Sequence, residues 1–228
     1  MNTNFDFFTL TIFRRCSMDQ LTKAVENHPV LQGHINNRIA KIYPDILHIE
    51  DYYNPEYNTL LKFSWWESEK YPGTIFLCCN LQDGMSSYSD FFRRSLNCEI
   101  FRCRMSMDLS PHKYPCNSFS YTSSSGESRN VLTYKEDRWV FYESGNILPF
   151  ENGEYYKNKY IKKRLNGNIL IEYISKLGYN FFDIDKNVIR CNTFERTSWR
   201  KKLEIENLDP DDLQNLKKII INVLNFNL

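Results

Sequence analysis

The sequence predicts an α+β fold, in which a strand-helix-strand unit near the N-terminus packs with an antiparallel meander and C-terminal helices. Three observations support this prediction. A continuous apolar run, Thr74–Cys79, precedes a segment with helical spacing of its apolar residues. Three short segments of β type, separated by turn residues, follow Pro111. Apolar stripes with helical spacing then recur near Ile169 and near Leu213.

Length and composition allow one domain or two closely packed parts. The chain has 228 residues, of which 42% are hydrophobic and 15% aromatic, so it has enough apolar surface to offset the entropy of ordering. We place a boundary near residue 110. It separates an α/β-type unit, 1–110, from a meander with helices, 111–228, and we expect the two to pack as one compact body.

Charge and cysteine content favour a soluble cytoplasmic protein. The formal net charge is +1, which gives no overall field to attract nucleic acid or an anionic membrane. No export signal and no run of 18 apolar residues are evident, so we expect no membrane association. The seven cysteines are odd in number and irregularly spaced, which is typical of free thiols in a reducing compartment.

The first elements are a strand at Phe5–Arg14 and a helix that begins after Ser17. The run Ser-Met-Asp-Gln matches a capping box, and we expect Pro29 to end the helix. Residues 30–71 give mixed signals. There we expect a short strand at Ile46–Glu50, followed by a loop at Asp51–Asn58.

The strand-helix-strand unit comes next. The apolar run Thr74–Cys79 predicts a strand covered on both faces, and Asp83 is expected to cap a helix from Gly84 to Leu96. Glu99–Met105 alternates as a strand. The two strands are expected to run parallel, joined by a right-handed crossover.

The meander and the later helices complete the prediction. Its strands are expected at 118–122, 129–134 and 138–143, and a polar helix at 154–165. An amphipathic helix from Ile169 is expected to stop at Gly178, and a hairpin to span 179–193. A final helix, capped by Asp209, carries Leu213 and Val223 on its apolar face.

The segment between the apolar strand and its helix is the first candidate site. It contains Asn80, Asp83, Ser86 and Ser87, and in open α/β sheets ligands gather at such a position. Asp83 would then be a base or a metal ligand, and the serines would hold an anion. The simpler interpretation is that Asp83 caps the helix.

Familiar catalytic and cofactor motifs are absent from the sequence. It has no G-x-x-x-x-G-K-[ST], G-x-G-x-x-G, G-x-S-x-G or H-E-x-x-H, and its cysteines and histidines lack chelating spacing. We therefore expect no cofactor and no metal. Cys116 near His112 suggests a thiol nucleophile, although a loop cysteine without chemistry explains the pair as well.

A second cluster of charged and aromatic residues lies in and beside the meander. Alternation places Arg138, Val140 and Tyr142 on one face. Its carboxylates Glu127, Asp137 and Glu143, together with Asp83, suggest acid-base chemistry of a hydrolase or nuclease. Cross-strand ion pairs are the more economical interpretation. The members are Glu127, Arg129, Asp137, Arg138, Trp139, Glu143 and Glu151.

A third cluster combines basic and tyrosine side chains in the predicted polar helix. Lysines neutralise phosphates and tyrosines stack on bases, so nucleic acid would bind here if it binds at all. A solvated helix face is the alternative, and tyrosines also suit protein recognition. The members are Tyr155, Tyr156, Tyr160, Lys162 and Lys163.

These observations favour a non-catalytic protein-binding module whose partner is another protein. The abundance of aromatic residues and the missing catalytic motifs suggest an immunity or inhibitor protein of a bacterial cytoplasm. A small carboxylate-dependent hydrolase or nuclease-like enzyme is the alternative, and nucleic-acid binding through 155–164 is a third possibility.

Overall fold

The computed structural model describes residues 5, 7–54, 59–106 and 115–198 of the chain. The final predicted helix, with Asp209 and Leu213, lies outside these residues, as does His112. No helix in the described ranges is long and apolar enough to cross a membrane.

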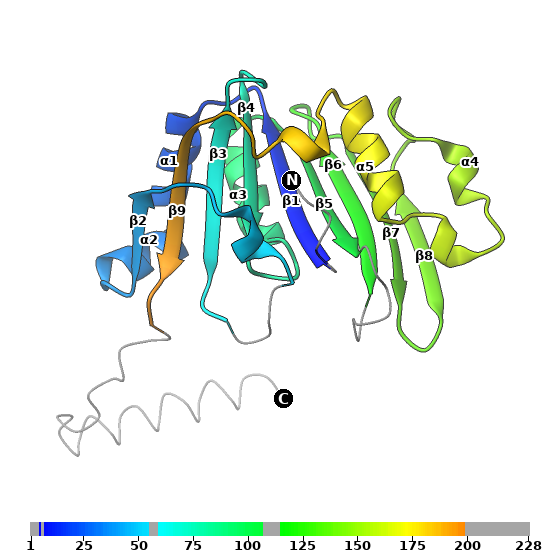
Figure 1. Cartoon of the computed structure of the whole chain (residues 1–228), viewed down its shortest axis with the longest axis horizontal. Helices are drawn as coiled ribbons and strands as arrows, with labels where there is room; N and C mark the ends of the chain where they lie inside the picture. Colours follow the sequence, from blue (N-terminus) through cyan, green and yellow to red (C-terminus); the bar gives the residue numbers. More distant parts are fainter. Residues whose placement is uncertain (1–4, 6, 55–58, 107–114, 199–228) are drawn as a thin grey trace, which may run out of the picture. The chain divides into compact units, whose positions relative to one another are not determined.

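A nine-stranded sheet forms the centre of the described chain, with the strand order β2-β9-β3-β4-β1-β5-β6-β7-β8 (Figure 1). All neighbouring strands are antiparallel. The predicted α+β class is therefore confirmed. The strands are β1 (Phe7–Arg14), β2 (Ala40–Pro44), β3 (Lys62–Ser68), β4 (Thr74–Cys79), β5 (Glu99–Ser106), β6 (Cys116–Thr122), β7 (Ser128–Lys135), β8 (Trp139–Ser144) and β9 (Val188–Arg196).

The predicted strand-helix-strand unit is present as β4, α3 (Ser86–Leu96) and β5. Both β4 and β5 pair antiparallel with β1, so they run in the same direction with β1 between them. The predicted meander is also present, since β6, β7 and β8 pair in succession. Strands on the two sides of residue 110 belong to one sheet, because β5 pairs with β6. The division of the chain into two parts at residue 110 stays a prediction.

Helices cover the two faces of the sheet in separate layers (Figure 1). One layer contains α1 (Met18–Glu26), α2 (Pro29–Asn36) and α3. The other contains α4 (Gly153–Tyr156), α5 (Gly167–Lys176) and the 3₁₀ helices η1 (Ile49–Tyr52), η2 (Ile161–Lys163) and η3 (Phe181–Asp183). Figure 1 draws no helix of the first layer over β7 and β8.

Two adjacent tryptophans in β3 show how the sequence fills both layers. Successive side chains of a strand point to opposite faces, so Trp65 packs in the layer of α1 and Trp66 in the layer of α5. Both rings are fully buried. The Trp65 indole donates to Thr22 Oγ1 at 3.1 Å and the Trp66 indole to the Ile184 carbonyl at 2.7 Å, so neither N–H is left unsatisfied.

The region 30–71 differs from its prediction. Pro29 does not simply end the first helix: α1 stops at Glu26, and Pro29 occupies the first turn of α2, where its missing N–H costs nothing. The strand expected at Ile46–Glu50 is wrong, because β2 lies earlier and η1 occupies Ile49–Tyr52. The aromatic strand β3 was not predicted.

Two later predictions also need correction. The expected polar helix at 154–165 is interrupted, because the Asn158 side chain accepts the Tyr160 N–H at 2.9 Å and turns the chain between α4 and η2. The expected hairpin at 179–193 is wrong. The Asn180 side chain accepts the Phe182 N–H at 3.1 Å and starts η3, while β9 pairs with β2 and β3 instead.

Candidate functional site

Strand β8 is an edge of the sheet. It pairs only with β7, and its residues make no backbone-backbone hydrogen bond to any other segment that the structure describes. In an antiparallel pair about half of the backbone N–H and C=O groups of an edge strand point outward. These groups can accept a further strand.

Apolar side chains form a compact block on the face of β7 and β8 that points away from α4 and α5. Leu132 is the cross-strand partner of Tyr142, and Tyr134 is the partner of Val140. Tyr142 is 52% exposed and the other three are partly exposed. Cross-strand neighbours of this kind present one continuous surface, which we call the β8 block.

The 3₁₀ helix η2 packs against β8 on the face that carries α4 and α5, opposite to the β8 block. The Arg164 guanidinium lies 5.3 Å from the Phe141 ring centroid, which fixes η2 beside the strand. Tyr160 is 52% exposed, and the amino groups of Lys159 and Lys163 lie 4.9 and 5.3 Å from its ring centroid. An exposed tyrosine between two cations therefore lies near the edge strand.

A buried ion pair anchors β7 and β8 from the opposite face. Arg129 in β7 has a side chain that is 2% exposed, and the Glu151 side chain is fully buried. The Arg129 Nε–Glu151 Oε1 and Nη2–Oε2 distances are 3.0 and 2.9 Å, which is a bidentate arrangement. Arg129 Nη2 also donates to Glu143 at 2.6 Å, and Nη1 donates to the carbonyls of Ser144 and Gly145. The end of β8 is held by this arginine.

The remaining oxygen sites of Glu151 are also occupied. Its Oε1 accepts the Leu148 N–H at 2.8 Å, and its Oε2 accepts the Tyr156 hydroxyl at 2.5 Å. Tyr173 in turn donates to the Tyr156 oxygen at 3.1 Å. Burial, followed by the hydrogen bond to Glu151, raises the pKa of Tyr156, so its phenol stays protonated. Every charged group here has its partners, which is typical of a structural network rather than a reaction centre.

The other carboxylates proposed for acid-base chemistry are not assembled with this network. Glu127 lies in the β6–β7 turn and Asp137 in the β7–β8 turn, and both are exposed. These turns are at opposite ends of β7, roughly 25 Å apart for a strand of this length. Asp83 lies in a third turn, before α3. No group of three or more potential metal-binding side chains occurs in the described ranges.

The residues between β4 and α3 stabilise the connection. Asn80 accepts the Lys62 N–H at 2.8 Å and donates to the Leu60 carbonyl at 2.7 Å. Asp83 accepts the Met85 N–H at 3.1 Å, but Met85, with φ of 55°, is the residue that precedes the helix. Asp83 therefore closes the preceding turn, and the expectation that it caps the helix directly is corrected.

The other candidates have varied positions. The Ser86 carbonyl accepts a hydrogen bond from Arg102 at 3.1 Å, and Ser87 is exposed.

The candidates of the other two clusters lie in the second part of the described chain. The Tyr155 hydroxyl donates to Glu172 at 2.7 Å. The remaining members lie in or near β8. Arg138 precedes the strand and is exposed, and Trp139 is its first residue and half-buried; Lys162 and Lys163 are exposed in η2. Cys116 is buried, and burial raises the pKa of its thiol, which disfavours the nucleophilic thiolate.

Sequence reasoning found half of the β8 block. Alternation placed Val140 and Tyr142 on one face, but Leu132 and Tyr134 were not identified. The signal available was that apolar residues occupy both faces of the last two meander strands, although only one face of such strands is normally buried.

Comparison with protein-family models, curated proteins and solved structures finds no match to this chain. The site is therefore interpreted from its own geometry.

Proposed function

We propose that the protein is a non-catalytic protein-binding module of the immunity or inhibitor type, which neutralises a toxin or another enzyme inside a bacterial cell. The partner docks at β8. The observation that carries this proposal is an unpaired edge strand flanked by exposed aromatic side chains, Tyr142 in the strand and Tyr160 beside it.

Strand addition explains how such an edge recognises a protein. A partner segment pairs with the outward backbone groups of β8, which supplies affinity, while side-chain contacts on alternate positions supply specificity. Tyr142 and the rest of the β8 block offer apolar contact area next to the strand. Tyrosine gives large area at low cost in conformational entropy, which is why it is common in protein interfaces.

The buried network favours binding by reducing its entropic cost. Arg129 and Glu151 hold β7 and the end of β8 in place before any partner arrives. A surface that is already ordered loses less freedom on association. Arg138, before the strand, and Lys162 and Lys163, in η2 on the opposite face from the β8 block, add basic groups around β8, which favours a partner with carboxylates at the corresponding positions.

The proposal is tested by affinity purification of the full chain from its native cell extract. We expect a stoichiometric protein partner that wild type retains and Tyr142→Lys loses. The matched control is Ile189→Lys, which changes a side chain that is 63% exposed in β9, near the other end of the sheet. In the purified complex, amide exchange should slow in β8 and not in β2, the opposite edge.

Three outcomes would count against the proposal. Retention of the partner by Tyr142→Lys would show that the interface does not lie at β8. Slower amide exchange at β2 instead of β8 would show the same. Copurification of a small molecule without any protein would contradict the class of function. Nucleic acid that is released steeply with salt, and lost on Lys162→Ala with Lys163→Ala, would support the nucleic-acid alternative instead.

A further inference from the structure

A basic groove lies on the side of the sheet that carries α5, away from the β8 block. It consists of two adjoining hollows of 510 and 420 Å³ that share Arg14 and Leu177. Both volumes are within the usual range for small-molecule sites. Four basic side chains line the hollows, namely Arg14, Arg15, Lys70 and Lys176, and no acidic side chain of the described residues does.

Ion pairs around the groove leave positive charge in excess. Arg14 and Arg15 share one carboxylate, with N–O distances to Glu99 of 3.1 and 3.3 Å. Lys70 and Lys186 likewise share Asp183, at 2.8 and 2.7 Å. The three groove-lining cations Arg14, Arg15 and Lys70, together with Lys186 outside the groove, therefore meet two carboxylates within ion-pair distance. This leaves an excess of two positive charges around the groove. Glu69 precedes Lys70 in the chain but does not line either hollow.

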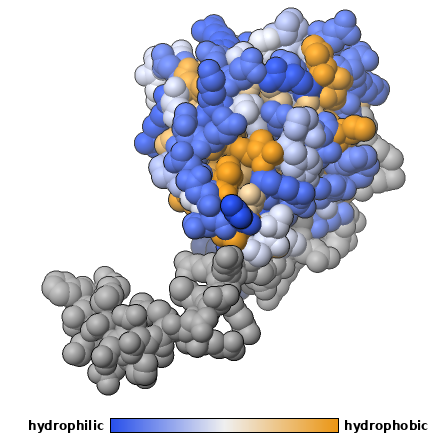
Figure 2. Space-filling model, turned by 90° about the vertical axis from the view of Figure 1, so that its left-hand side faces the viewer, coloured by the Kyte–Doolittle hydropathy of each residue, from blue (hydrophilic) through white to orange (hydrophobic). Residues whose placement is uncertain are grey.

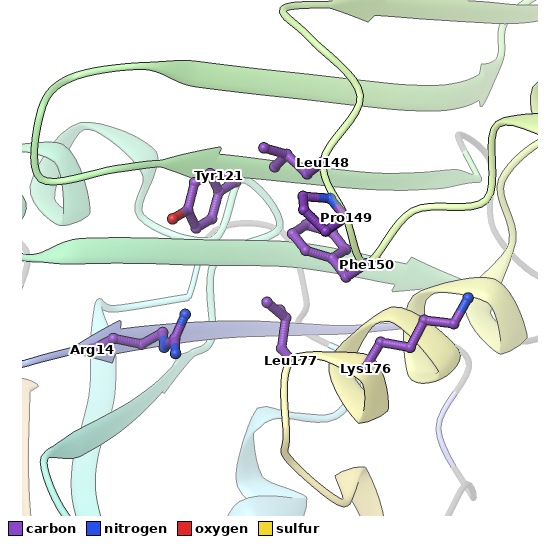
Figure 3. A pocket seen from close by; sticks show the side chains of 7 residues that line it. All are labelled: Arg14, Tyr121, Leu148, Pro149, Phe150, Lys176 and Leu177. Carbon is purple, nitrogen blue, oxygen red and sulfur yellow. The ribbon is translucent and has the colours of Figure 1, made fainter.

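Lys176 is not part of this excess. Its amino group lies 2.6 Å from Glu172, a one-to-one pair on α5. Figure 3 shows that the Lys176 side chain points away from Arg14. Its position in the last turn of α5 also matches the preference of that helix end for a positive charge.

The backbone holds Arg15 in an unusual conformation beside the groove. Its φ is 62°, in the left-handed region that residues other than glycine seldom adopt. The Arg15 N–H donates to the Gly73 carbonyl at 2.9 Å, which ties it to the β3–β4 turn. The Arg15 side chain remains 73% exposed. Residues held in sparsely populated backbone conformations are found more often than average at ligand sites.

The second part of the groove is apolar. Figure 3 shows the Arg14 guanidinium directed toward Leu177, with Tyr121 and the segment Leu148–Phe150 across from it. Leu148 and Leu177 are partly buried and pack against the large core cluster. One end of the groove is thus cationic, and the other provides apolar and aromatic contacts.

We propose that this groove binds a small phosphate monoester. Its phosphoryl group lies among Arg14, Arg15 and Lys70, and its apolar or aromatic body lies against Leu148, Phe150 and Leu177. A phosphate monoester carries a charge of about −1.5 to −2 at neutral pH, which matches the excess of two cations, whereas a single carboxylate would neutralise only half of it. Arginine is well suited to phosphate because its planar donors meet two oxygens at once.

Calorimetric titration of the full chain with phenyl phosphate tests the proposal. We expect one site per chain, weaker binding of inorganic phosphate and no binding of phenol. Arg15→Gln and Lys70→Gln should each weaken phenyl phosphate about tenfold without changing the melting temperature. Arg38→Gln is the matched control, since Arg38 is also an exposed arginine with a left-handed backbone, φ 56°, but does not line the groove.

The opposing results are distinct. Failure of wild type to bind phenyl phosphate at millimolar concentration would overturn the proposal, as would equal losses in Arg15→Gln and Arg38→Gln. If inorganic phosphate bound as tightly as phenyl phosphate, the apolar end of the groove would contribute nothing to binding, which would contradict that part of the proposal. Tighter binding of a phosphotyrosine peptide would assign the site to a phosphorylated protein rather than a small molecule. None of these outcomes depends on the partner at β8.

Discussion

Arg129 and Glu151 form a bidentate ion pair inside the protein, although 22 positions separate them in the sequence. The pair connects β7 to the segment that leads into α4, and Glu143 of β8 joins it through the same guanidinium. The side chains of Arg129 and Glu151 are almost inaccessible to water. Such a pair is costly to break, because removal of one partner leaves the other charged and buried.

Replacement of Arg129 should therefore be among the most destabilising changes in the protein. We expect Arg129→Ala to lower the free energy of unfolding by about 3–5 kcal/mol, because Glu151 loses its main partner. Arg138→Ala, at an exposed arginine next to β8, should change it by less than about 0.5 kcal/mol. Urea unfolding of both variants measures the difference, and equal effects would show that the buried pair is not a structural anchor.

The contribution of Asp83 to stability follows from the hydrogen bond with which it closes the turn before α3. Asp83→Asn should preserve stability, because the asparagine oxygen can still accept the Met85 N–H. Asp83→Ala should cost about 1 kcal/mol, equivalent to a fall of about 2–4 °C in the melting temperature. Thermal unfolding of the two variants tests this, and a stable Asp83→Ala protein would mean that the hydrogen bond contributes nothing.

Alkaline pH should destabilise the protein through its buried thiols. Burial raises the pKa of Cys79 to about 11 and that of Cys103 and Cys191 to about 12, from an ordinary value of 9.0. The unfolded chain therefore releases these protons first as the pH rises. Stability should fall from pH 9 to 12, by about 1.4 kcal/mol per pH unit for each thiol that only the folded state keeps protonated.

Urea unfolding in reducing buffer across this range measures the slope. Cys103→Ala should be less stable throughout, but its stability should fall less steeply with pH because one such thiol is missing. Identical slopes in the two proteins would exclude Cys103 as a contributor. The buried tyrosine Tyr52, whose pKa burial also raises, should add to the loss above its own ordinary value of 10.0.

Amide exchange in the free protein should reveal the unpaired edge. We expect alternate amides of β8 to exchange rapidly, because about half of them point away from β7. Amides of β1 should be protected along its length, since it has β4 and β5 on its two sides. Exchange measured by NMR separates the two patterns, and uniform protection of β8 would show that another part of the chain covers this edge.

Local patterns in the sequence were sufficient for much of the fold. The Ser17 capping box starts α1 as expected, with both reciprocal hydrogen bonds formed. The apolar run of β4 and the alternation of β5 identified two strands of the sheet correctly, and Gly178, with φ of 97°, follows α5 as predicted. These signals are local, because they reflect periodicity and caps within a few residues.

The parts that were missed depend on distant residues. Strand β3 has polar residues at both ends and lies between β4, its neighbour in the sequence, and β9, more than 100 positions away, so only one of its two partners is local. The basic groove is invisible for the same reason, since Arg14, Lys70 and Leu177 come from three separate regions of the chain. The dipeptide Arg14-Arg15 at the end of the first strand was a local signal, but basic pairs are common on protein surfaces.

The position of β9 has a consequence for the order in which the protein assembles during synthesis. This strand is the last that the structure describes, yet it lies between β2 and β3, which the ribosome produces more than 120 residues earlier. Until it emerges, β2 has no neighbour with which to pair, and one flank of the aromatic strand β3 stays open. A nascent chain that stalls before residue 188 would therefore expose an incomplete sheet with an unpaired edge at β3. Such a chain would be prone to aggregate and would be expected to bind chaperones.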